Sequence, residues 1–165
     1  MAPKIHEHSG FTLLEIIIAI SLLMLLTGGV IAGYSTFNDT QKIKQTALTF
    51  KSYLRSAQTK ATSGVKPAVC TTLDGYIVRV DVSSYTVDAM CDGSIVTDAD
   101  TSYSVALTSQ TIVSSPVTAS FVFRVLTRAV SLAQITTYTF TSGSKGYQIS
   151  VSPSGDINEL GFVTL

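Results

Sequence analysis

The sequence predicts an α+β fold in which a long amino-terminal helix packs on a carboxy-terminal antiparallel β-sheet domain. Residues 11–34 form an apolar run, residues 43–61 carry an apolar stripe at helical spacing, and later segments are rich in Val, Ile, Thr and aromatic residues. The chain has 165 residues, of which 45% are hydrophobic and 13% charged. This length allows one modest domain, or one domain plus an appendage, and this composition excludes a disordered, highly charged chain.

The apolar run at residues 11–34 is long enough to cross a bilayer as a helix. It would span about 36 Å at the α-helical rise, against roughly 30 Å for the hydrocarbon core. Its one charged side chain is Glu15, and between Ile16 and Leu26 the one polar residue is Ser21, so no face of this helix is polar. The mean hydropathy of the whole chain, +0.38, reflects this run. We expect it to be the transmembrane first half of the helix.

Glu15 helps to choose between kinds of membrane segment. A cleaved secretory signal has a positive amino-terminal region and a short apolar run, whereas here Lys4 and Glu7 cancel and the run is long. A plain membrane anchor explains the hydropathy but not Glu15, because a carboxylate at the centre of a membrane helix costs about 2.5–3.5 kcal/mol. A third interpretation, in which Glu15 reaches the headgroups from near the helix end, remains open.

Residues 9–15, Ser-Gly-Phe-Thr-Leu-Leu-Glu, resemble the cleavage motif of type IV prepilins and type II secretion pseudopilins. The resemblance implies a pilin fold with a cytoplasmic leader at residues 1–10. It also implies that a prepilin peptidase cuts between Gly10 and Phe11 and methylates the new amine. In this family the carboxylate at the position of Glu15 pairs with the amine of a neighbouring subunit during assembly. Such pairing neutralises the carboxylate and the amine, each of which is costly to bury alone in a dry environment.

Three glycines lie near the carboxy-terminal end of the apolar run. Gly29 and Gly33 form a small-xxx-small pair that can seat a neighbouring helix closely. Together with Gly28 they also weaken the helix by roughly 1 kcal/mol each relative to alanine, and the resemblance implies local unwinding when subunits enter a filament. Close packing and local melting both stay open.

Residues 35–66 are expected to continue the helix as an amphipathic segment. The helix should end near Ser63 and Gly64, with Pro67 just beyond. One face is apolar and needs a domain folded against it. The residues of this stripe are Ile43, Ala47, Phe50, Leu54, Ala57 and Ala61.

Residues 67–165 are expected to form an extracytoplasmic, β-rich globular domain. Its candidate strands alternate or are rich in β-branched and aromatic residues, and short turn sequences between them favour antiparallel pairing. The candidate strands are residues 76–82, 85–90, 103–113, 117–126, 135–141 and 147–151. Cys70 and Cys91 bracket the first two. We favour a structural disulfide over two buried thiols, because oxidation is expected outside the cytoplasmic membrane and closing this loop adds about 3 kcal/mol.

Charge is unevenly placed along the domain. Residues 38–67 are mostly basic and residues 68–100 mostly acidic. The two segments can simply be solvated surfaces, or the basic helix of one subunit can face the acidic rim of another. The bases are Lys42, Lys44, Lys51, Arg55, Lys60 and Lys66, and the acids are Asp74, Asp81, Asp88, Asp92, Asp98 and Asp100.

A second resemblance covers more of the chain. Residues 54–58 and 61–64, followed by Cys70, Tyr76, Cys91 and the pattern at 147–157, are similar to the GspH/FimT group of minor pilins and pseudopilins. Residues 123–131 depart from that group, because Arg128 stands where a glycine-containing turn is expected. Some FimT-like members bind DNA. Here nucleic acid is an unfavoured partner, because the tail at 155–165 has no base and Arg124, Arg128 and Lys145 supply little phosphate affinity.

The sequence predicts no catalytic residue, cofactor or metal site. Both histidines, His6 and His8, lie in the leader, so the mature chain lacks the histidine of a catalytic triad or of a zinc site. Asp98 and Asp100 are explained by loop solvation. We therefore expect a structural minor pilin or pseudopilin. Its expected partners are the prepilin peptidase, other pilin subunits, the inner-membrane assembly platform and, before assembly, membrane lipid. A DNA-binding minor pilin and a plain anchored domain are the alternatives.

Overall fold

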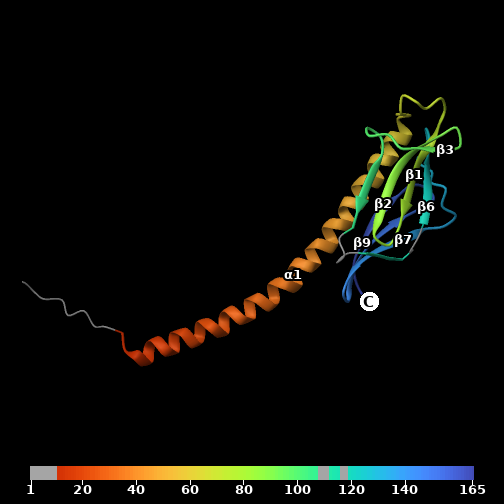
Figure 1. Ribbon diagram of the computed structural model, residues 1–165. Coiled ribbons are helices and arrows are strands. Elements are labelled where there is room, and N and C mark those ends of the chain that lie inside the picture. Colours follow the sequence, from red (N-terminus) through yellow and green to blue (C-terminus); the bar gives the residue numbers. More distant parts are fainter. Residues whose placement is uncertain (1–10, 108–111, 116–118) are drawn as a thin grey trace, which may run out of the picture. The chain divides into compact units, whose positions relative to one another are not determined.

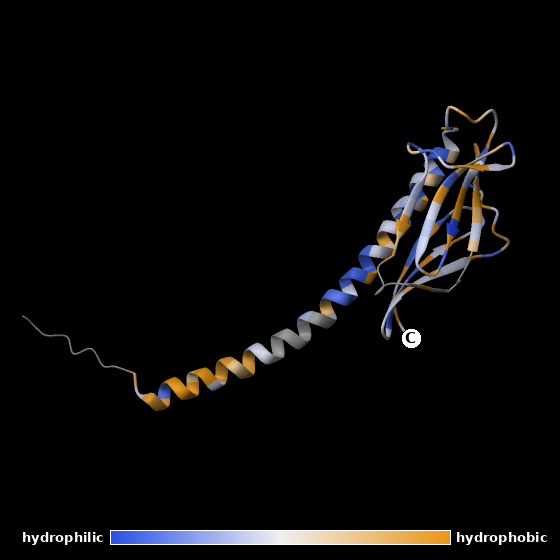
Figure 2. Cartoon of the chain, in the orientation of Figure 1, coloured by the Kyte–Doolittle hydropathy of each residue, from blue (hydrophilic) through white to orange (hydrophobic). Residues whose placement is uncertain are grey.

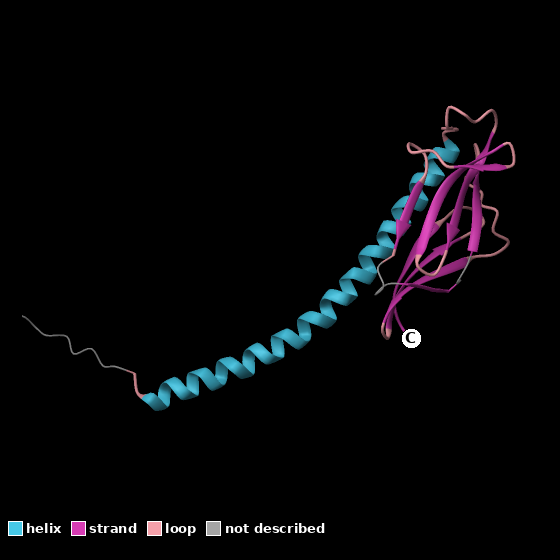
Figure 3. Cartoon of the chain, viewed as in Figure 1, coloured by secondary structure: helices cyan, strands magenta, loops and turns pink. Residues whose placement is uncertain are grey.

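A computed structural model describes residues 11–107, 112–115 and 119–165, and its α+β architecture confirms the predicted fold class (Figures 1 and 3). The chain divides into two compact units, Met1–Asn38 and Asp39–Leu165. The elements are α1 (Leu13–Thr62), β1 (Leu73–Val80), β2 (Ser84–Cys91), β3 (Ser94–Val96), β4 (Tyr103–Ala106), β5 (Ile112–Ser115), β6 (Ala119–Arg124), β7 (Thr136–Ser142), β8 (Lys145–Val151) and β9 (Ile157–Thr164).

The part of α1 that belongs to the second unit packs on the sheets through the predicted stripe. All six stripe residues, from Ile43 to Ala61, are buried, with exposed fractions of 1% or less. The helix ends as predicted, because Gly64 takes a left-handed φ of 64°. The amide of Gly64 donates to the carbonyl of Ala61 and the amide of Val65 to that of Lys60. This Schellman motif satisfies carbonyls that the helix end would otherwise leave without donors.

The domain has two antiparallel sheets where the sequence predicted one. The first has the order β3-β2-β1-β6, with β4 also paired to β2, and the second has the order β5-β7-β8-β9. The candidate strand 103–113 was therefore wrong, since β4 and β5 belong to different sheets. The backbone amide of Leu107, just after β4, donates a hydrogen bond to the carbonyl of Ser83, and the amide of Val113 in β5 donates to the carbonyl of Val82. The turn between β1 and β2 is therefore bonded both to the end of β4 and to β5. Residues 108–111, 117 and 118 of the candidate strands lie outside the described residues.

Two strands were not anticipated, β3 and β9. β9 pairs along β8, but Gln148 faces Gly161 while Ile149 faces Glu159, so Leu160 is an extra, bulged residue. The bulge interrupts the alternation of side chains, and most side chains of β9 are exposed at the edge of the second sheet. The strand therefore lacks the period-2 signal on which a sequence prediction depends.

The core lies between α1 and both sheets and is rich in aromatic residues. Phe50 of α1 contacts Tyr85 of β2, at 5.0 Å between ring centroids, and both Tyr138 and Phe140 of β7, at 5.4 and 5.2 Å. Burial raises the pKa of the Tyr85 and Tyr138 hydroxyls well above the usual value. One phenylalanine thus joins the helix to both sheets.

The predicted disulfide is present. Cys70 and Cys91 are bonded, with 5.5 Å between their Cα atoms, and both are buried. The bond ties the loop after α1 to the end of β2. Nearby, the Tyr76 hydroxyl donates to the carbonyl of Val65 at 2.8 Å, so the same region is held by a second tie.

Leu126 is held in a conformation that leucine disfavours. Its φ is 57°, and 75% of its surface is exposed, so packing of the side chain does not compensate the left-handed backbone. The turn holds this conformation through its backbone. The amide of Leu126 donates to Ala61 at 3.1 Å, and that of Arg124 donates to Ala129 at 3.1 Å.

Replacing Leu126 with Gly is expected to stabilise the protein by about 1 kcal/mol, because glycine adopts a positive φ without strain. Thermal unfolding of the purified full-length chain, followed by circular dichroism, measures the effect. Ile135→Gly is the matched control, since Ile135 is also exposed, at 66%, but has no positive φ. The control should lower the midpoint of thermal unfolding slightly. A lowered midpoint for Leu126→Gly as well would contradict the interpretation that the backbone at Leu126 is strained.

Candidate processing and assembly segment

The first described residues lead directly into α1. Phe11 is 78% exposed, and Thr12 is the residue that caps the helix. The Glu15 amide approaches the Thr12 side-chain oxygen at 3.3 Å and the Thr12 carbonyl at 3.1 Å. Thr12 and Glu15 have the T-x-x-E spacing of a capping box. Sequence reasoning missed Thr12, although this spacing could have found it. Gly10 lies outside the described residues, so the structure places only the Phe11 side of the predicted cleavage site.

Glu15 lies in the first turn of α1 and its side chain is exposed. A carboxylate near a helix amino terminus is stabilised by about 0.3–1 kcal/mol, because the unpaired amides there carry partial positive charge. Among the described residues the ion pairs are Lys51–Glu159 and Arg79–Asp88, so Glu15 has no basic partner within this part of the chain. The carboxylate is therefore available to a cation from elsewhere.

The segment that follows Glu15 presents apolar side chains to its surroundings on all sides. From Leu13 to Leu26 its large apolar side chains are 46–78% exposed, and Figure 2 shows hydrophobic residues dominating this first part of α1. The hydroxyls of Ser21 and Thr27 donate to the helix carbonyls of Ile17 and Leu23, at 2.8 and 2.7 Å. These bonds satisfy both hydroxyls without water, as a helix in lipid or in a dry bundle requires.

Over the described residues, no helix is both long and apolar enough to cross a membrane. The side chains of Gly29 to Gly33 are not described, so both interpretations of Gly29 and Gly33 remain predictions.

Comparison with known families identifies this segment. Residues 6–31 match the family model of the prokaryotic N-terminal methylation motif. The chain carries the signature of type IV pilins and pseudopilins. This pilin-type motif implies processing by a prepilin peptidase and assembly with other pilin subunits, and it is typical of structural rather than enzymatic proteins. No curated protein and no solved structure is significantly similar to the chain. The resemblance to the GspH/FimT group is therefore not confirmed.

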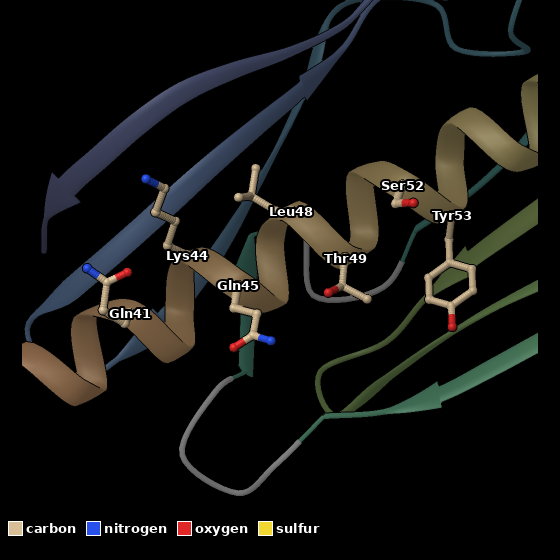
Figure 4. Close-up of a pocket in the computed structure, with 7 residues that line it drawn as sticks. All are labelled: Gln41, Lys44, Gln45, Leu48, Thr49, Ser52 and Tyr53. Carbon is tan, nitrogen blue, oxygen red and sulfur yellow. The ribbon is translucent and has the colours of Figure 1, made fainter.

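The face of α1 that points away from the core carries a shallow hollow. This open hollow has a volume of about 680 Å³ and is lined by Gln41, Lys44, Gln45, Leu48, Thr49, Ser52 and Tyr53 (Figure 4). Lys44 is the one charged residue of this set. An open hollow of mostly uncharged side chains along a helix suits contact with another protein surface better than chemistry on a small molecule.

Several bases of the helix already have partners inside the domain. Lys51 bonds Glu159 at 2.5 Å, and the Tyr147 hydroxyl donates to the same carboxylate at 3.0 Å. The hydrogen bond from Lys51, which has the larger effect, and the one from Tyr147 together hold the pKa of the Glu159 carboxyl below its usual value. Lys60 donates to the Tyr103 hydroxyl at 2.8 Å and lowers the pKa of that tyrosine. Within the described residues, no three His, Cys, Asp or Glu side chains gather as metal ligands do.

Proposed function

We propose that this chain is a structural subunit, a minor pilin or pseudopilin, of a type IV pilus or a type II secretion pseudopilus. The observation that carries the proposal is the match of residues 6–31 to the methylation motif, at the point where an exposed apolar helix begins. In this proposal residues 1–10 are a cytoplasmic leader that the prepilin peptidase removes between Gly10 and Phe11. Residues 11–34 anchor the subunit in the cytoplasmic membrane, and they later form the assembly helix.

Glu15 has a defined part in this proposal. Cleavage creates an amine at Phe11, and this amine follows the apolar helix into a dry environment. A cation from a neighbouring subunit that reaches Glu15 removes two uncompensated charges at once. Because this pairing is possible at one axial position only, it sets the register between subunits. The cap at Thr12 supports the geometry, because it keeps Glu15 in the first turn of α1.

The β-rich domain, residues 67–165, lies outside the cytoplasmic membrane in this proposal and forms the exposed surface of the filament. The Cys70–Cys91 disulfide supports an oxidising compartment for this domain. The inner-membrane assembly platform and lipid are the partners before assembly, and other pilin subunits are the partners afterwards. Residues 35–66, which include the carboxy-terminal part of α1, connect the anchor to this domain.

Mass spectrometry of the native protein tests the proposal. The mature chain is expected to begin at Phe11 and to carry one added methyl group on its amine. The peptides to examine are the first ones released from membrane and filament fractions of the native host. A chain that still begins at Met1 in both fractions would refute processing and would favour a plain membrane anchor.

A further inference from the structure

A basic hollow lies between α1 and the turns at one end of the domain. Arg55 of α1 and Arg128 of the turn after β6 face it, together with Asp156 and Asn158 near the start of β9. Its volume is about 450 Å³. The hollow gathers residues that are far apart in the sequence, so the charge pattern along the chain, which groups Arg55 with the bases of the helix, does not predict that Arg128 lies on the same hollow.

The backbone around the hollow is closely fixed. Gln58 donates to the carbonyl of Gly155 at 2.7 Å, and the amide of Val130 donates to Pro153 at 2.9 Å. Gly155 has a φ of 89°, and a Cβ at this position would lie 1.9 Å from the carbonyl oxygen of Arg128. Only glycine fits there, so the 152–156 turn presses directly on the backbone that carries Arg128. The backbone segments that carry Arg55 and Arg128 are therefore held at a defined spacing.

Neither guanidinium is neutralised within the part of the chain that is described. Arg55 and Arg128 take part in no ion pair there. The carboxylate of Asp156 accepts a hydrogen bond from the Ser154 hydroxyl at 2.8 Å, and Glu159, which follows Asn158 in β9, is already paired with Lys51. Arginine presents a planar fork of donors that matches a carboxylate, so the hollow is suited to an incoming carboxylate.

An acidic loop lies between β3 and β4. The amides of Thr101 and Ser102 donate to the carbonyl of Asp98 at 3.2 and 2.7 Å, and the amide of Asp100 donates to the Asp98 carboxylate at 2.9 Å. Lys60 holds this loop through the backbone carbonyl of Asp100, at 3.0 Å, rather than through a carboxylate. The carboxylates of Asp98 and Asp100 therefore have no ion-pair partner in the described structure, and the backbone hydrogen bonds fix the conformation of the loop that carries them.

The hollow and the acidic loop lie on opposite sides of α1. On one side Gln58 contacts Gly155 and Lys51 contacts Glu159 of the second sheet. On the other side the ring of Tyr53 lies 5.0 Å from that of Tyr103 in β4, next to the acidic loop. Figure 4 shows Lys44 and Tyr53 pointing to these two different sides. Each domain thus has a basic flank and an acidic flank.

We propose that the hollow of one copy of this chain receives the carboxylates of Asp98 and Asp100 from a second copy, an inference that rests on the proposed filament function. A contact between two different flanks is heterologous, and such contacts repeat from copy to copy, which is the kind of interface that a helical filament requires when the repeat does not close into a ring. Nucleic acid fits less well, because Asp156 lines the hollow and two arginines neutralise few phosphates.

Charge reversal in the full-length chain tests this contact. R55E/R128E and D98K/D100K are each expected to lower incorporation into filaments by about tenfold, because like charges then face each other. The chain that carries all four substitutions should recover to within about threefold of the wild type, since opposite charges face each other again. R124E is the matched control: it reverses an exposed arginine at the other end of the same turn, outside the hollow, and should incorporate normally.

The outcomes separate this inference from the proposed function. Normal incorporation of both double variants, or no recovery in the four-substitution chain, would overturn the flank-to-flank contact while processing at Phe11 still stands. Should the wild type itself be neither processed nor incorporated, the proposed function fails first. A gel shift of DNA by the purified chain that is lost in R55E/R128E would assign the hollow to nucleic acid and overturn the contact. If either double variant unfolds, R55Q/R128Q and D98N/D100N replace it, and each should lower incorporation without reversing charge.

Discussion

Replacing Glu15 with Gln is expected to leave membrane insertion intact and to reduce incorporation into filaments by about a hundredfold or more. Glutamine has nearly the same size, and it also serves at the last position of a capping box, so the helix start at Thr12 should be preserved. Only the negative charge is lost. An amine left without its partner in a dry environment costs about 3–5 kcal/mol, which corresponds to at least a hundredfold in an assembly equilibrium.

The measurement compares the amount of the chain in sheared filaments with the amount in membranes. Asp39→Asn is the matched control, because Asp39 lies on the same helix and loses the same charge outside the apolar segment. It should incorporate at the wild-type level. If Glu15→Gln also incorporates at the wild-type level, the carboxylate does not guide assembly, and Glu15 is explained by the helix terminus alone.

The features that the sequence predicted correctly depend on neighbours along the chain. The stripe from Ile43 to Ala61 is a local period, and the end of the helix depends on Gly64 and its flanking residues. The disulfide could be anticipated because the chain has only two cysteines, Cys70 and Cys91. The processing motif is also a contiguous string of residues. Such features need no knowledge of the tertiary fold.

The features that escaped prediction depend on contacts between distant residues. The division into two sheets is decided where β4 pairs with β2 while β5 pairs with β7, and no local pattern reports that choice. β9 was missed because its bulge breaks the alternation of side chains. The basic hollow forms because Gln58 meets Gly155, which lies 97 positions further along the chain. Periodicity can predict elements, but it does not show which elements meet.

The largest effect on stability is expected from replacing Phe50 with Ala. The Phe50 side chain is fully buried, and its ring contacts Tyr85 in one sheet and both Tyr138 and Phe140 in the other. Removing a buried phenylalanine costs about 3–5 kcal/mol, because the transfer free energy is lost and a cavity remains. The surrounding rings belong to three different elements, so no single small movement can close the cavity. The expected loss is a large share of the 5–15 kcal/mol that is typical of domains.

Thermal unfolding of the full-length chain in detergent, followed by loss of the β-sheet circular dichroism signal, measures this effect. A decrease of about 10 °C or more in the midpoint is expected for Phe50→Ala. Phe37→Ala makes the same change on the same helix at a residue that is 62% exposed, and it should leave the midpoint nearly unchanged. Equal midpoints for the two variants would mean that Phe50 does not join α1 to both sheets.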